Sequence, residues 1–416
     1  MPISTELTET NILPGRGKPR PVLHDWNPTL LADTVARYFA PDFLKRLGIT
    51  RVGDLTGLDT IGLPVWFAVQ PNSRTLAVNQ GKGLTHDQAR ISAVMEAAES
   101  AIAERPERLA DRYCSLNELI DAGEQAVPLG RMSGCIFDAF DPERERAWVP
   151  GRSWKTGERV FAPYELVGLD MRVDAPWDRD AFRISSIGLG ASTKFEPAAL
   201  HGLLEVVEND GIAPLEAFDT LDGFARPLKY RAGAHAGLDE AVAKCVVAGF
   251  QPLFFDLTGN VQLPVAGCFV PRDVTGKAGP GTRYSAGFAC RFDAHEAALS
   301  ALLEAVQSRL THISGARDDI DPPDYAPFAR TIPAPPAGAP SIGEFAALFE
   351  TQRDPTFDTA ARLVCQSGAE DIFVFPLSGD SEGVHVVKVL VPGLMAVFDD
   401  GLVTADAGMI ARLLED

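Results

Sequence analysis

The sequence predicts an α+β fold in which helices and β-strands form one interlocked unit. Apolar, strand-like runs recur along the chain, as in residues 64–69, 263–270 and 384–391. Three glutamate-containing helical segments lie between such runs. Hydrophobic residues make up 46% of the 416 residues, which is enough for a substantial core. We therefore expect the three acidic helices to be held by this core and to line a central cleft.

Each acidic helix carries a glutamate followed three residues later by a second carboxylate or amide. The pairs are Glu96 with Glu99, Glu205 with Glu208, and Glu304 with Gln307. Residues three apart project from the same helix face, so each helix offers two oxygen ligands. One such pair alone is typical of a solvent-facing helix surface. Three pairs in apolar sequence, where unpaired carboxylates are costly to bury, favour a shared cation site.

The type of ligand indicates the type of cation. Five carboxylates that meet in one place would neutralise about two divalent ions, and hard oxygen ligands suit Mg²⁺ or Ca²⁺ better than Zn²⁺. Mg²⁺ held by carboxylates commonly binds phosphates as well. The sequence therefore indicates a divalent-cation site with a phosphate-bearing ligand.

The first hundred residues read as an extended arm followed by mixed structure. Residues 1–30 are proline-rich, and their basic cluster at 15–20 is either a solvated tail or an arm that reaches toward phosphates. A helix near 30–46 precedes strands at 49–52, 64–69 and 75–78. We expect Gly81-Lys82-Gly83 to form a loop before the first acidic helix, which begins around Thr85 to Asp87. Lys82 between two glycines can approach a phosphate, although the P-loop spacing is absent.

The remaining segments alternate in the same way. Residues 105–180 predict a β-rich insertion with strands at 146–149 and 159–162, and residues 185–192 predict a small-residue loop ahead of the second acidic helix. Strands at 252–256 and 263–270 follow, and residues 287–290 lead into the third acidic helix. A proline- and alanine-rich linker at 321–340 precedes helices at 342–350 and 356–367 and strands at 371–375 and 384–391. We thus expect a loop followed by an acidic helix three times.

Composition excludes several classes of function. The net charge of −19 disfavours nucleic acid or an anionic membrane surface as a partner and favours a basic peptide. No run of about 18 apolar residues and no signal-peptide pattern occurs, so we expect a cytoplasmic protein without a membrane partner. The six cysteines are scattered and are expected to be buried thiols.

The order and spacing of these motifs resemble the YcaO superfamily. The resemblance covers most of the chain, through residues 48–65, Gln80 to Gly83, Ser92-x-x-x-Glu96-x-x-Glu99, residues 185–210, 304–310, 314–319 and 387–394. It implies a single domain over 1–416 with mixed and antiparallel sheets packed against helices. Within it we expect a first lobe at 1–104, the insertion at 105–180, a second lobe at 181–320, the linker at 321–340 and a terminal α/β unit at 341–416.

The resemblance implies ATP- and Mg²⁺-dependent activation of a peptide backbone amide. Members phosphorylate the amide oxygen, and a nucleophile then attacks the carbon to give an azoline, a thioamide or an amidine. Glu96, Glu205 and Glu304 would be catalytic, and with Glu99 and Glu208 they would hold Mg²⁺. The residues expected to bind the nucleotide are Lys82, Ser92, Ser186, Gln307, Arg309 and Arg317.

Four positions depart from the family pattern. Ser100, Asn209 and Ser300 stand where the family often has a basic residue, and Ile187 stands where it often has asparagine. Basic side chains pair with phosphate, so their absence leaves open a non-catalytic YcaO-like subunit that binds a peptide or a partner protein. A third alternative, unrelated metal-assisted hydrolysis, is disfavoured because no His/Cys ligand cluster occurs, although His86 and His201 adjoin the acidic helices as candidate bases.

The subclass follows from two further segments. Residues 307–319 resemble members that act with a TfuA partner in thioamidation, and the C-terminus lacks the proline-rich tail of many azoline-forming members. The chain has no obvious peptide-clamp domain, so recognition of the leader of a precursor peptide is expected from a partner protein. A homodimer is compatible with the resemblance.

Overall fold

The computed structural model describes residues 36–218, 221, 223–271, 284–317, 319, 332, 334–349 and 354–396. The basic cluster at 15–20 and most of the predicted linker at 321–340 lie outside these residues. Among the residues described, no helix is long and apolar enough to cross a membrane. Every strand pair within the three sheets is antiparallel, in agreement with the expected α+β architecture.

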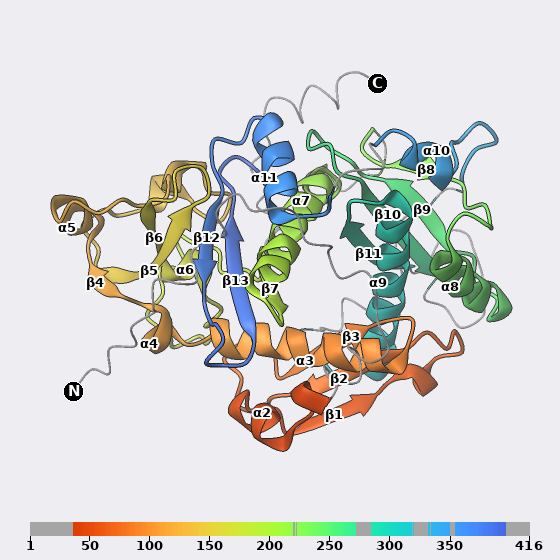
Figure 1. Cartoon of the computed structure of the whole chain (residues 1–416), viewed down its shortest axis with the longest axis horizontal. Coiled ribbons are helices and arrows are strands. Elements are labelled where there is room, and N and C mark those ends of the chain that lie inside the picture. Colours follow the sequence, from red (N-terminus) through yellow and green to blue (C-terminus); the bar gives the residue numbers. More distant parts are fainter. Residues whose placement is uncertain are drawn as a thin grey trace.

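A three-stranded sheet and the first acidic helix form the lower part of the molecule in Figure 1. The strand order is β1-β2-β3, with bounds β1 Arg51–Asp54, β2 Val65–Val69 and β3 Val78–Lys82. Helix α3 (His86–Ala103) packs on β2 and β3. It begins at Thr85, as predicted, because Thr85 and Gln88 form a reciprocal capping box. Helix α2 (Pro41–Arg46) and the 3₁₀ turn η1 (Thr56–Leu58) flank the sheet.

A four-stranded sheet carries the third acidic helix. Its order is β11-β10-β9-β8, with bounds β8 Arg226–Leu228, β9 Leu253–Asp256, β10 Val265–Pro271 and β11 Tyr284–Cys290. Helix α9 (Ala294–Ser314) packs on β10 and β11, and α8 (Ala236–Val247) and α10 (Ile342–Ala346) pack on α9. Apolar side chains of these helices and strands form one of three hydrophobic clusters.

The largest sheet joins segments that are far apart in the sequence. Its order is β4-β5-β12-β13-β7, with β6 also paired to β5, and the bounds are β4 Arg112–Cys114, β5 Arg146–Ser153, β6 Arg159–Pro163, β7 Leu189–Ser192, β12 Phe373–Pro376 and β13 His385–Leu390. The second acidic helix, α7 (Phe195–Phe218), packs on β7 and β13, and α11 (Phe357–Gln366) packs on α7. The strands of the predicted insertion and of the terminal unit therefore share one sheet.

The shorter helices cover the edges of this sheet and its loops. They are α4 (Pro106–Leu109), α5 (Leu116–Asp121), α6 (Tyr164–Val167) and the 3₁₀ turns η2 (Leu129–Arg131) and η3 (Phe137–Ala139). Figure 1 shows this part of the chain at the side of the molecule away from α9.

Each acidic helix follows a strand that packs closely against it. The prediction of a loop directly before each helix is wrong, because Gly81 and Lys82 lie in β3, residues 189–192 form β7 and residues 287–290 end β11. Residues 185–188, ahead of β7, do form a loop. The glycines allow close approach: a Cβ on Gly81 would lie 2.0 Å from the backbone nitrogen of Ala93 in α3. Gly190 and Gly287 meet the backbones of α7 and α9 in the same way, at 2.2 Å. The glycines mark strand-to-helix contact rather than turns.

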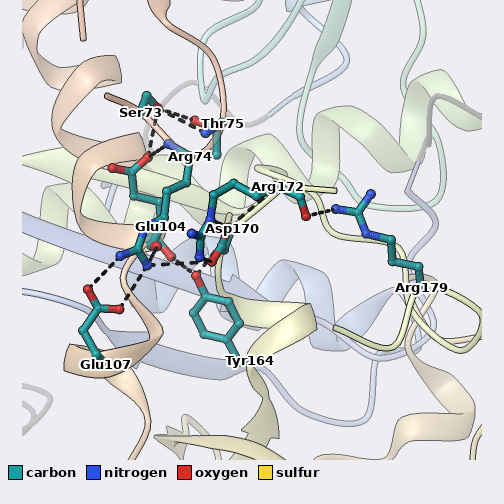
Figure 2. A network of polar contacts seen from close by, with 10 residues as sticks. Ser73, Arg74, Thr75, Glu104, Glu107, Tyr164, Asp170, Arg172 and Arg179 are labelled. Atoms are coloured by element: carbon teal, nitrogen blue, oxygen red, sulfur yellow. Dashed lines mark hydrogen bonds and ion pairs between the residues drawn. The ribbon is translucent and has the colours of Figure 1, made fainter. Parts of the chain in front are cut away.

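A polar network fixes the C-terminal end of α3 (Figure 2). One carboxylate oxygen of Glu104 accepts hydrogen bonds from the Ser73 hydroxyl at 2.9 Å and from the Arg74 backbone nitrogen at 2.6 Å. The Arg74 guanidinium donates to both oxygens of Glu107, at 3.0 and 3.1 Å. The Tyr164 hydroxyl donates to the carbonyl of Ala103 at 2.8 Å. The β2–β3 turn and α6 thereby hold the helix that carries Glu96 and Glu99.

Candidate functional site

Five glutamates from three helices influence one another electrostatically, and we call them the acidic cluster: Glu96, Glu99, Glu205, Glu208 and Glu304. Burial, and then the charges of Glu96 and Glu205, raise the pKa of Glu99 well above its ordinary value. Burial, and then Glu304 and Glu205, do the same for the pKa of Glu208. The structure therefore brings together the five glutamates that the sequence singled out (Figure 1 shows α7 and α9 above α3).

The acidic cluster is partly buried and remains accessible to water. Burial and the charge of Glu96 raise the pKa of Glu205 to about 8. The Glu96 side chain nevertheless remains exposed, and the other four are partly exposed. Two cavities of about 260 and 200 Å³ are lined by residues outside the cluster, so the predicted central cleft stays a prediction.

Lys82 lies within the acidic cluster. Its Nζ donates to Oε2 of Glu304 at 2.8 Å, with side-chain exposures of 23% and 34%. Burial alone would lower the pKa of Lys82, but the carboxylates of Glu304, Glu96 and Glu208 outweigh it and raise that pKa. Lys82, the last residue of β3, therefore stays a cation at the position where the sequence predicted a phosphate contact.

Backbone nitrogens from the loop before β7 and from the end of β11 donate hydrogen bonds to two of the carboxylates. The backbone nitrogen of Gly188 donates to Oε2 of Glu205 at 3.1 Å, and that of Cys290 donates to Oε2 of Glu208 at 3.2 Å. Ser186 is exposed at the tip of the loop at 185–188, and its carbonyl accepts from the Leu189 nitrogen at 2.8 Å. This loop therefore adjoins Glu205, as the predicted nucleotide contact at Ser186 requires.

Ser92 and Gln307 lie beside the cluster by their place on the helices. Ser92 is four residues before Glu96 on α3, and Gln307 is three residues after Glu304 on α9, so both share a face with a cluster residue. Both side chains are partly exposed. Their roles in nucleotide binding stay predictions.

The two predicted arginines differ in where they lie. The charge of Arg317 lowers the pKa of Glu96, which places it near the cluster, and its Nε donates to Oδ1 of Asp319 at 2.8 Å. Arg309 is instead 1% exposed and forms a two-pronged ion pair with Asp59, at 2.7 and 3.1 Å. Its Nη1 also donates to the carbonyl of Pro271 at 2.7 Å. The structure thus commits Arg309 to the core beneath α9, which leaves it unsuited to the predicted nucleotide contact.

Two of the residues that stand in place of a basic residue, Ser100 and Asn209, form hydrogen bonds within the protein. The Ser100 hydroxyl donates to Oδ1 of Asn79 at 3.1 Å in the interior. The Asn209 side-chain amide donates to the carbonyl of Glu205 at 3.0 Å. Neither group can neutralise a phosphate.

Two cations near the cluster were missed by the sequence reasoning. The charge of Arg291 partly opposes the rise in the pKa of Glu208, and the charge of Lys388 does the same for Glu99 and Glu205. A lone lysine in the apolar run 384–391 was the available signal for Lys388, and the position of Arg291 just before α9 was the signal for the second. His201 is exposed on the face of α7 that carries Glu205.

The donor set fits a divalent cation in its chemistry. Burial and the charges of neighbouring glutamates raise the pKa values of Glu96, Glu99, Glu205 and Glu208, which is the condition that a bound cation relieves. All five carboxylates of the cluster offer hard oxygen ligands of the kind that Mg²⁺ prefers. Within the described part of the chain, no three acidic, His or Cys side chains are already placed at metal-binding distances from one another. The cluster therefore has the ligands for a cation, and their side chains would adjust to bind it.

Comparison with known proteins identifies the family of this chain. The family model described as "YcaO cyclodehydratase, ATP- and Mg²⁺-binding" matches residues 80–395. A Rhizobium leguminosarum bv. trifolii protein, named an uncharacterized protein in the tfuA 3′ region, is 35% identical over 381 residues, which cover 87% of this chain and 88% of that protein. An uncharacterized Methanothermobacter thermautotrophicus protein is 30% identical, with coverage of 85% and 91%.

Solved structures share the fold. YcaO from Methanopyrus kandleri, bound with AMPPCP and Mg²⁺, superposes with a TM-score of 0.68 at 23% identity, covering 90% of this chain and 94% of that one. A heterocyclase in complex with substrate and cofactor gives a TM-score of 0.70 at 18% identity, covering 93% of this chain and 55% of that one. ATP and Mg²⁺, predicted as cofactors, are thereby confirmed for the family, and the chain belongs to the YcaO family.

Proposed function

We propose that this protein is an ATP- and Mg²⁺-dependent enzyme that activates a peptide backbone amide by phosphorylating its oxygen. The amide oxygen would attack the γ-phosphorus of ATP, with ADP leaving, and a nucleophile would then attack the amide carbon, with phosphate leaving. The observation that carries the proposal is the convergence of five glutamates from α3, α7 and α9. An amide is a poor electrophile because its oxygen leaves badly, and phosphorylation removes that barrier.

The acidic cluster would hold the metal. Mg²⁺, when bound, would neutralise charge on the phosphates during transfer. Glu96, Glu205 and Glu304 contribute one carboxylate from each helix, and Glu99 and Glu208 add a second from α3 and α7. The strands that precede the helices fix these five side chains on rigid elements, as precise ligand placement requires.

Cations of the chain would supply the phosphate contacts. Lys82 is the strongest candidate because its ammonium is already bonded to Glu304. Arg317 interacts electrostatically with Glu96, and Arg291 interacts in the same way with Glu208. These three cations would replace the basic residues that the family often has at positions 100, 209 and 300. Ser92, Ser186 and Gln307 would add neutral contacts to the nucleotide.

A non-catalytic role is the second candidate. It is favoured by the hydrogen bonds that Ser100 and Asn209 form within the protein. Such a subunit would keep the fold and bind a peptide or a partner without using ATP.

The product is proposed to be a thioamide, formed with a TfuA-like partner. Support comes from the run at 307–319 and from the name of the Rhizobium relative, which places that protein beside tfuA. An azoline product is the alternative within the same chemistry. The net charge of −19 favours a basic precursor peptide, recognised with help from the partner. We also propose that the protein is cytoplasmic and that it forms a homodimer.

ATP turnover distinguishes the two candidates. Purified protein would be mixed with ATP, Mg²⁺, a TfuA-like protein and candidate precursor peptides, and ADP and phosphate would be measured. The enzyme predicts release well above that of Glu304→Ala. Glu196→Ala, which removes an exposed glutamate in the first turn of α7, should behave as wild type. Equal release by wild type and Glu304→Ala would favour the non-catalytic role.

A further inference from the structure

Lys388 is a buried ammonium group beside the acidic cluster. It lies in β13, opposite Leu189 of β7 and Phe375 of β12, and is 1% exposed. A buried ammonium is costly unless it is hydrogen-bonded and paired with a negative charge. Its Nζ donates to the carbonyl oxygen of Ser185 at 2.5 Å. Lys388 thus reaches from the sheet into the loop that precedes α7.

The Lys388 side chain interacts electrostatically with glutamates from two helices. Burial lowers the pKa of Lys388 to about 8, and Glu205 of α7 and Glu99 of α3 partly oppose that shift. Lys388 therefore lies close enough to two of the proposed metal ligands to interact with both.

The loop at 185–188 is tied to β13 at both ends. Ser185 is held through Lys388, and the carbonyl of Gly188 accepts from the Val389 nitrogen at 2.8 Å. Gly188 has a φ of 86°, and a Cβ there would lie 2.3 Å from the carbonyl oxygen of Val389, so only glycine fits this contact. The Gly188 nitrogen meanwhile donates to Glu205. Loop, strand and carboxylate form one connected unit.

We propose that Lys388 is a positioning residue that holds the loop at 185–188 in place and, through the Gly188 nitrogen of that loop, the side chain of Glu205. The inference rests on the proposed function, because it assigns the loop and Glu205 to nucleotide and metal binding. Lys388 holds Ser185 and the Val389 nitrogen holds Gly188, so the loop is fixed at both ends before a ligand binds. The nucleotide then meets a loop that is already ordered, so less ordering has to occur on binding.

Hydrogen exchange in nucleotide-free protein tests the positioning. Lys388→Met removes the charge and the donor with little change in length, and Lys388→Gln keeps a donor without the charge. Lys244→Met, which removes a lysine paired with Glu240 on α8, is the matched control. We expect the amides of residues 187–189 to exchange about tenfold faster or more in the Met variant, less in the Gln variant and unchanged in the control.

Binding of Mg²⁺·ATP to the folded variants separates positioning from simple stabilisation. Lys388→Met should weaken binding about tenfold because the loop must be ordered at that step. A merely structural lysine would lower the midpoint of thermal unfolding while leaving both loop exchange and affinity as in wild type. That result would overturn the proposal, as would failure of both Lys388 variants to fold. If wild type bound no Mg²⁺·ATP, the proposed function would fail, whereas the exchange result would still decide the structural coupling.

Discussion

Replacing Glu205 by glutamine should remove a pH-dependent loss of stability. Burial first, and then the charge of Glu96, raise the pKa of Glu205 from 4.5 to about 8 in the folded protein. Between these values the unfolded chain ionises Glu205 while the folded protein keeps it protonated. Ionisation therefore favours the unfolded state, and the free energy of unfolding falls as pH rises from about 4.5 through 8.

The size of this loss follows from the same values. The interval from 4.5 to 8, at about 1.4 kcal/mol for each pH unit, corresponds to about 5 kcal/mol. Because water reaches the partly exposed cluster, we expect about 2 kcal/mol of it to be observed. Mg²⁺ should restore stability at pH 8, since it binds the ionised carboxylates of the folded protein only.

Urea unfolding at several pH values, with the divalent ions chelated, measures this effect. Wild type should lose about 2 kcal/mol more than Glu205→Gln between pH 5 and 8. Glu196→Gln, on the exposed face of α7, should follow wild type. Parallel curves for wild type and Glu205→Gln would refute the reasoning that Glu205 is held against other carboxylates.

Three further changes test the surrounding structure. Arg309→Met should lower the free energy of unfolding by about 3–5 kcal/mol, because it leaves Asp59 buried and unpaired. Adding Asp59→Asn should recover part of this stability, and the ATP affinity of the folded protein should stay unchanged. A loss of ATP affinity without a loss of stability would instead indicate that Arg309 binds the nucleotide. Gly81→Ala should cost about 1–3 kcal/mol in urea unfolding and weaken ATP binding, because β3 must move away from α3, and a neutral effect would show that the two backbones are not in contact. Glu104→Gln should lower the thermal midpoint by loosening the end of α3 from Arg74 (Figure 2), whereas an unchanged midpoint would contradict the network.

Much of the fold could be predicted from local sequence patterns. Thr85 and Gln88 mark the start of α3 because their capping box depends only on neighbouring residues. The apolar run at 384–391 contains β13 for the same kind of reason. Loops were wrongly predicted directly before the acidic helices, because the glycines at 81, 190 and 287 were taken as loop signals. Glycine is needed at these positions because each strand contacts a helix backbone, and that contact exists only in the tertiary structure.

The site was predicted in part for a similar reason. The Glu-x-x-Glu spacing on a helix is local, so the five glutamates could be found from the sequence. Arg309 has the same local setting as a cleft residue, and only the fold shows its pairing with Asp59. Lys388 reaches the cluster across a sheet that joins β7 to β13, about two hundred residues apart in the chain. Helix α8 was not predicted.

Calorimetric titration of ATP with Mg²⁺ into the purified protein, beside Glu96→Ala, tests the central claim most directly. The account predicts saturable binding by wild type that is lost in Glu96→Ala and retained in the control Glu196→Ala. Absence of binding in folded wild type, with and without a TfuA-like partner, would contradict the claim that the acidic cluster is a nucleotide site. Binding of full strength in Glu96→Ala would contradict the assignment of this cluster.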